Sequence, residues 1–122
     1  MRTQTFTYKG ATITVKRAVI RDRLAANMVI ALLEVGHDPI ERYAASEFAQ
    51  CVALTVEIDG DLGFTMPKAS ATPDELKAGF EAWLEAEPTL LMEWQTAIAL
   101  ASIALNDPDL TPDTPLEKKE TA

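Results

Sequence analysis

Few side chains in this sequence are of the types that perform catalysis or bind metal ions. His37 is the only histidine and Cys51 is the only cysteine. A catalytic or metal-binding histidine needs partner side chains, and neither a second histidine nor a cysteine cluster is available. Cys51 lies in the apolar stretch FAQCVAL, which predicts a small buried side chain. We therefore expect neither an intramolecular disulfide bond nor a multi-cysteine metal site.

The remaining polar motifs do not predict catalysis either. The stretch DGDLG at 59–63 is like the start of a calcium loop, but an EF-hand needs glycine at its sixth position and glutamate at its twelfth. Those two positions hold Phe64 and Ser70. The glycines lack the lysine of a phosphate-binding loop, and no serine lies in a GxSxG setting. The close pair Glu85 and Glu87 is typical of a charged, solvent-facing surface, so we predict a protein that is not an enzyme and has no cofactor.

Charge is distributed unevenly along the 122 residues, whose net charge is −8. Residues 1–23 hold six basic residues and one acid, whereas residues 62–122 hold four basic residues and eleven acids. This asymmetry suits head-to-tail self-association or a charged protein partner, although a solvated surface with an accidental bias explains it as well. The overall acidity argues against general nucleic-acid binding, which needs a basic face.

The composition is that of one soluble domain, with 48% hydrophobic and 25% charged residues. The first residues, MRTQTFTYKG, lack the apolar core of a signal peptide. The longest apolar stretches, MVIALL and AIALASIAL, fall far below the ~20 residues that span a bilayer. We expect an intracellular protein that does not enter a membrane.

The stretch TFTYKGATITVKR predicts a β-hairpin at about residues 4–16, with a two-residue turn at Lys9-Gly10. That register pairs Tyr8 with Ala11, Phe6 with Ile13 and Gln4 with Val15. Because side chains alternate along a strand, one face is apolar and the other consists of threonines. The threonine face is formed by Thr5, Thr7, Thr12 and Thr14. We expect the apolar face to pack on helices, and the threonine face and strand edges to be available for self-association.

Apolar periodicity and capping residues predict four helices, at about residues 18–35, 39–58, 73–87 and 89–105. Gly36 is expected to form a left-handed cap after the first helix. The segment CVALTVEI, which ends the second helix, is rich in β-branched residues and is compatible with a strand; we favour a helix to about Ile58. The fold class is therefore mainly α with an N-terminal β-hairpin, a small single domain at 1–105 and a flexible, Pro/Asp-rich tail at 106–122.

The second half of the first predicted helix and the C-terminal half of the fourth are apolar on nearly all sides, which is typical of a helix in a subunit interface or buried on several sides. A compact monomer that buries most of this surface is the simpler alternative. If the surface binds a client or another subunit, the candidate contact residues are Met28, Val29, Leu32, Leu33, Leu90, Ala97, Leu100 and Ala104. Self-association is the simplest such contact, so we expect a homo-oligomer.

The order of these parts resembles the tail assembly chaperones of long-tailed bacteriophages. The likeness is carried by FTYKGATITVKRAVIRDRLAANMV, then VEIDGDLGFTMP, then FEAWLEAEPTLLMEWQTAIALAS, and covers about residues 5–105. It implies a small, non-catalytic, mostly helical protein that binds the tape measure protein and tail tube subunits. It also implies action in the cytoplasm of the infected bacterium, absence from the mature virion, and a longer form made by a translational frameshift. Lys118-Lys119 is the candidate frameshift position.

Two other functions are compatible with the sequence. An acidic phage or prophage inhibitor that imitates nucleic acid would use the cluster formed by Glu81, Glu85, Glu87, Asp107 and Asp109. The basic hairpin end counts against this hypothesis. The other function is that of a small enzyme whose site has no recognisable motif.

Overall fold

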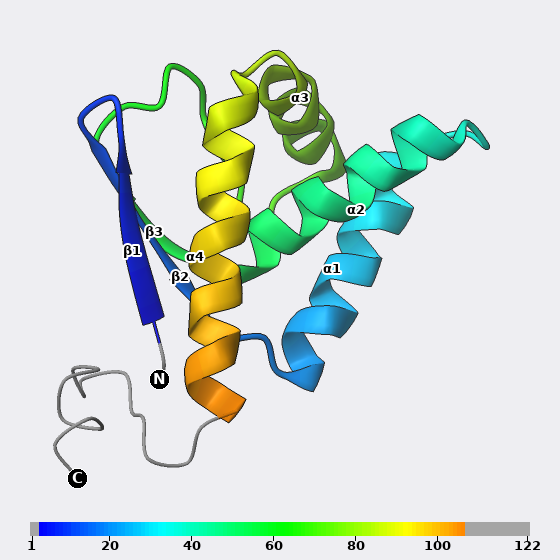
Figure 1. Ribbon diagram of the computed structural model, residues 1–122. Helices are drawn as coiled ribbons and strands as arrows, with labels where there is room; N and C mark the ends of the chain where they lie inside the picture. Colours follow the sequence, from blue (N-terminus) through cyan, green and yellow to red (C-terminus); the bar gives the residue numbers. More distant parts are fainter. Residues whose placement is uncertain (1–2, 107–122) are drawn as a thin grey trace, which may run out of the picture.

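The computed structural model describes the backbone of residues 3–106 and the side chains of residues 3–103. Within that range the chain forms three strands and four helices (Figure 1). In chain order these are β1 (Thr3–Tyr8), β2 (Ala11–Lys16), α1 (Ile20–Leu33), α2 (Pro39–Leu54), β3 (Thr55–Asp59), α3 (Pro73–Leu84) and α4 (Pro88–Asn106). The mainly helical fold with an N-terminal hairpin is therefore confirmed. The predictions about residues 107–122 lie outside the described residues.

The register of the hairpin is the predicted one. Strands β1 and β2 are antiparallel, and the pairs Tyr8–Ala11, Phe6–Ile13 and Gln4–Val15 all occur. Lys9 and Gly10 both have positive φ, of 48° and 85°. This is the conformation of a type I′ turn, whose twist matches that of the flanking strands.

The prediction that the second helix continues to Ile58 is wrong. Helix α2 ends at Leu54, and β3 follows at once and pairs antiparallel with β2. Thr55 makes the change of direction, because its backbone is extended, with φ of −84° and ψ of 122°. Its backbone N–H and its hydroxyl both donate to the carbonyl of Cys51 and so complete the last turn of α2. The β-branched residues that follow favour an extended backbone. The hairpin is therefore part of a three-stranded sheet with β2 in the middle.

Other helix boundaries differ by a few residues from the predicted ones. Helix α1 ends at Leu33, and the left-handed cap is Glu34 with φ of 54° rather than Gly36. Helix α3 ends at Leu84 rather than at residue 87. The starts of α2 and α3 follow the predicted caps: the Asp38 carboxylate accepts from the N–H of Ile40, and Thr72 and Glu75 form a capping box. Capping rules located the starts of helices better than their ends.

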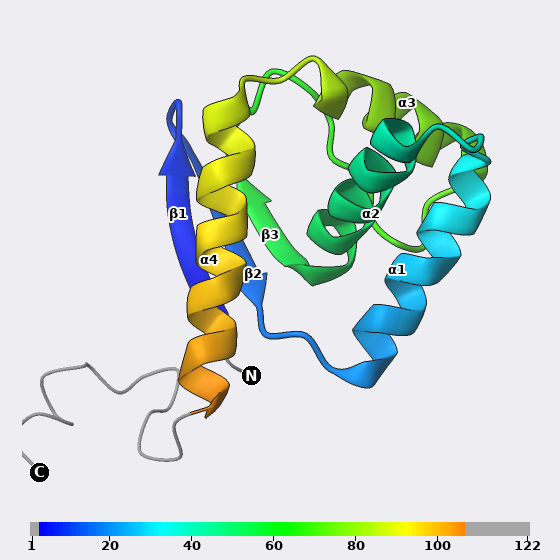
Figure 2. The ribbon, with the colours of Figure 1, turned by 45° about the vertical axis from the view of Figure 1, so that its right-hand side comes forward.

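Helix α4 runs along one face of the sheet beside β1 and β2, and α1, α2 and α3 are grouped on the side away from β1 (Figure 2). Two groups of aromatic side chains mark the centres of the core. The ring of Phe6 in β1 meets the edge of Trp94 in α4, with centroids 5.8 Å apart. Phe48 of α2 packs against Phe80 and Trp83 of α3, at 5.2 and 5.5 Å. One continuous cluster of buried apolar side chains joins the two centres.

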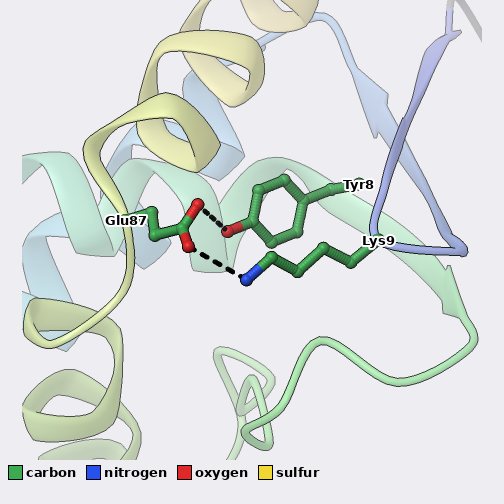
Figure 3. A network of polar contacts seen from close by, with 3 residues as sticks. All are labelled: Tyr8, Lys9 and Glu87. Atoms are coloured by element: carbon green, nitrogen blue, oxygen red, sulfur yellow. Dashed lines mark hydrogen bonds and ion pairs between the residues drawn. The ribbon is translucent and has the colours of Figure 1, made fainter.

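Polar contacts at both ends of the hairpin attach the sheet to the helices. At the hairpin tip, Glu87 in the α3–α4 connection accepts from the Tyr8 hydroxyl at 3.1 Å and from the Lys9 ammonium at 3.0 Å (Figure 3). Hydrogen bonding to Lys9 lowers the pKa of Glu87, and the same bond raises the pKa of Lys9. At the other end of the hairpin, Lys16 lies 3.0 Å from the carboxylate of Asp22, which is only 7% exposed. The second contact fixes the start of α1 relative to β2.

Candidate protein-interaction surfaces

The side chains that most often serve in catalysis and metal binding are scattered in this fold. His37 is exposed in the connection between α1 and α2. Across residues 3–106, no group of three or more histidine, cysteine, aspartate or glutamate side chains is placed to hold a metal ion. Likewise, no helix in this range is long and apolar enough to cross a lipid bilayer.

Cys51 is buried, as the sequence predicted, and it is not a reactive thiol. It lies on the core side of α2 among the buried apolar residues. Burial, with a smaller contribution from the charge of Glu47, raises the pKa of the Cys51 thiol far above its ordinary value of 9.0. A thiol that stays protonated is a poor nucleophile.

This raised pKa predicts how stability changes in alkali. The unfolded thiol ionises from about pH 9, whereas the buried thiol stays neutral, so proton loss favours the unfolded state above that pH. Relative to the variant Cys51→Ala, the wild-type protein should therefore lose up to about 1.4 kcal/mol of unfolding free energy per pH unit above the unfolded pKa. Urea unfolding of both proteins at about pH 8 and about pH 10 measures this. A stability difference that stays constant would contradict it.

The most prominent exposed apolar feature is one face of α1. Ile20, Leu24 and Met28 are 81%, 62% and 67% exposed, and they recur at every fourth residue. At 100° per residue this α1 stripe points almost directly away from the buried positions Val29 and Leu33. Helix α1 is therefore apolar on two opposite faces, of which the fold covers one.

The predicted contact residues divide into three groups. Val29, Leu33, Leu90 and Ala97 are buried in the core, so the prediction that they form a contact surface is wrong for the folded domain. Met28 belongs to the α1 stripe, Leu32 beside it is half-buried, and Leu100 on α4 is 46% exposed. Ala104 lies beyond the described side chains.

A second apolar surface lies between α2 and α3, and the sequence did not indicate it. Ile40 and Tyr43 of α2 are 80% and 66% exposed, and Leu84 of α3 is 48% exposed. Ile40, Ala44 and Leu84 line two neighbouring hollows of about 280 and 420 Å³. We call the two together the α2–α3 groove. Besides α2 and α3, the first hollow includes the start of α4 at Pro88, and the second includes the end of α1 at Leu33.

The rim of the α2–α3 groove is acidic. The carboxylates that line it are Asp38, Glu41, Glu47, Glu81 and Glu87. Lys77 is the basic residue of the lining, and its ammonium lies 2.9 Å from Glu34. The groove therefore presents an apolar floor surrounded by negative charge.

The threonine face is the uncovered face of the sheet, but it is not formed by threonines alone. Thr5 and Thr7 on β1 are exposed, whereas Thr12 and Thr14 are half-buried and pair with Asp59 and Glu57 of β3. The expectation that both strand edges of the hairpin are free is wrong for β2, because β3 occupies that edge. The edge of β1 is the outer one (Figure 2). A role of this face in self-association stays a prediction.

The acidic cluster of the inhibitor hypothesis is not assembled by the described residues. Glu81 and Glu85 are exposed near the end of α3, but Glu87 is bonded to Tyr8 and Lys9. Asp107 and Asp109 lie outside the described residues, as does the candidate frameshift position Lys118-Lys119. No family model matches this chain, and neither a curated protein nor a solved structure matches it.

Proposed function

We propose that this protein is a non-catalytic binding protein that acts as a tail assembly chaperone of a long-tailed bacteriophage. Its main client would be the tape measure protein, around which tail tube subunits assemble. It would act in the cytoplasm of the infected bacterium and be absent from the mature virion. The likeness in the layout of the sequence supplies the biological setting, and the exposed α1 stripe supports the binding role.

The α1 stripe carries the proposal because it is suited to a long helical client. Three apolar side chains at successive turns of a helix match the spacing by which amphipathic helices recognise each other. Fully burying one such side chain contributes about 1.5–3 kcal/mol. Three of them support reversible binding, and Met28 adapts to differently shaped partners because methionine is flexible.

Disrupting the α1 stripe should abolish client binding. We expect the wild-type protein to keep co-expressed tape measure protein soluble and to copurify with it. The double variant Leu24→Glu with Met28→Glu should lose this, because it places two charges where apolar contact is needed. Met92→Glu on α4, at a residue 64% exposed, makes the same kind of change away from the stripe and serves as the control. Copurified client is measured, with circular dichroism to verify folding.

Two results would contradict the proposal. Failure of the wild-type protein to bind the tape measure protein would overturn the chaperone function itself. Binding by the double variant at the wild-type level would overturn the role of α1. The neighbouring DNA offers an independent check, since a tape measure gene should follow directly, with an A-rich slippery run encoding Lys118-Lys119.

A further inference from the structure

We propose that the α2–α3 groove of one copy binds helix α1 of a second copy, so that self-association covers the α1 stripe that a client would use. The docking follows from the two surfaces alone. The competition with a client rests in addition on the proposed function.

The two surfaces match in shape. One is a single helix with apolar side chains at three successive turns, Ile20, Leu24 and Met28, spanning about 12 Å at 1.5 Å per residue. The other is a pair of adjoining hollows between helices, with a shared apolar wall of Ile40, Ala44 and Leu84. A helix lying in such a groove is a recurrent mode of recognition.

The charges around the two surfaces are opposite. Arg21 and Arg23 are exposed and, at 100° per residue, lie on either side of the α1 stripe. Neither arginine forms an ion pair among residues 3–103. The three ion pairs in this range are formed by Lys9, Lys16 and Lys77. The groove presents Asp38, Glu41, Glu47 and Glu81 on its rim, besides Glu87, which already forms an ion pair with Lys9. Docking α1 into the groove would bring these arginines to that rim.

Charge also decides between the possible arrangements of two copies. If α1 met α1, the arginines of both copies would face each other, and if groove met groove, the acidic rims would do so. Like charges brought together across an interface cost several kcal/mol and exclude wrong partners. The favoured contact is therefore between unlike surfaces.

Both surfaces of one molecule can be used at once. No residue of the α1 stripe lines either hollow, and the stripe points away from the core. A contact between unlike surfaces leaves one α1 and one groove free at the ends of every pair, so it continues to a ring or an open chain. In this assembly the groove of a neighbouring copy covers the apolar stripe until a client takes its place. This covering protects a surface that would otherwise be prone to aggregation.

Mixing two half-inactivated variants tests the docking. The first variant, Leu24→Glu with Met28→Glu, lacks a working stripe, and the second, Ile40→Glu with Leu84→Glu, lacks a working groove. Each alone should bind its own copies about 100-fold more weakly than wild type and sediment as a monomer. An equimolar mixture keeps one intact stripe and one intact groove, so it should form a heterodimer and nothing larger. Wild-type protein should form larger species as its concentration rises and dissociate in high salt.

The comparison variant is Thr5→Glu with Thr7→Glu, which charges the threonine face on β1. The docking predicts unchanged self-association in this variant, in contrast to the prediction that the threonine face joins the copies. The docking is overturned if wild type stays monomeric, if the mixture stays monomeric, or if the threonine variant is the one that dissociates. Circular dichroism confirms that every variant is folded.

A separate measurement tests the competition. Adding the tape measure protein to wild-type oligomers should dissociate them. Oligomers that bind it without dissociating would overturn the competition while leaving the chaperone function intact. Oligomers that assemble by this docking and bind no tape measure protein would overturn the proposed function and leave the docking standing.

Discussion

Replacing Trp94 by alanine is expected to lower the free energy of unfolding by about 3–5 kcal/mol, the largest loss from any single substitution considered for this fold. Trp94 is fully buried and is the largest such side chain in the core. Its ring contacts Phe6 of the hairpin, so the substitution leaves a cavity between α4 and the sheet. A loss of this size is comparable with the whole stability of many small domains.

The indole N–H of Trp94 makes a separate contribution to stability. The indole N–H of Trp94 donates to the hydroxyl of Thr55 at 3.1 Å, at the residue where α2 ends and β3 begins. Trp94→Phe keeps most of the ring but removes this hydrogen bond, and should cost less than the alanine variant. Thus Trp94 stabilises both the contact of α4 with the hairpin and the junction that starts the third strand.

Urea unfolding followed by circular dichroism measures both variants, since tryptophan fluorescence would change with the substitution itself. Met92→Ala is the matched control on α4, because Met92 is exposed and its truncation should change stability by less than about 0.5 kcal/mol. A loss below about 1 kcal/mol for Trp94→Ala would contradict a well-packed contact between α4 and the sheet.

Replacing Gly79 by alanine is expected to destabilise the protein, although alanine is the better helix former by about 1 kcal/mol. Gly79 is buried in the middle of α3, where a Cβ atom would lie 2.5 Å from Cδ and 2.7 Å from Cγ of Pro67. Such distances require the loop before α3 to move away. We expect a net loss of about 1–3 kcal/mol, because overpacking outweighs the gain in helix propensity.

A double substitution identifies the cause. Pro67→Ala removes the two ring atoms that clash, so Gly79→Ala should cost less in that background than in the wild type. Ala78→Gly, at the exposed neighbouring position, reports the propensity effect alone and should cost about 1 kcal/mol. If Gly79→Ala is stabilising in the wild-type background, the close packing of α3 on Pro67 is not rigid and the expectation fails. Thermal or urea unfolding of the wild type and the four variants provides the comparison.

The candidate interaction surfaces were only partly accessible from the sequence. Met28 and Leu100 were predicted as contact residues and are exposed. The α2–α3 groove was missed because its walls come from two helices, and its hollows also reach the end of α1 at Leu33 and the start of α4 at Pro88. No periodicity within a single segment indicates such a surface. Ile40 lies at helical spacing from the buried Phe48 and Cys51, yet it is in the first turn of α2 and stays exposed.

Local rules explain what the sequence by itself determined. The hairpin register follows from the alternation of side chains and from a turn that suits Lys9-Gly10, and both depend on neighbouring residues. The starts of α2 and α3 follow from Asp38 and from the Thr72–Glu75 capping box. Burial of Cys51 follows from its apolar neighbours. Each of these features is decided within a few residues, so an isolated segment contains the necessary information.

Only the tertiary structure decided the third strand and the outward face of α1. Residues 55–59 are compatible with helix or strand, and pairing with β2, distant in sequence, makes them a strand. Helix α1 is apolar on two opposite faces, so its own sequence does not select a core-facing side. The packing of Val29 and Leu33 against the other helices makes that selection. It leaves Ile20, Leu24 and Met28 in solvent, because one helix cannot bury two opposite faces in a domain with a single core.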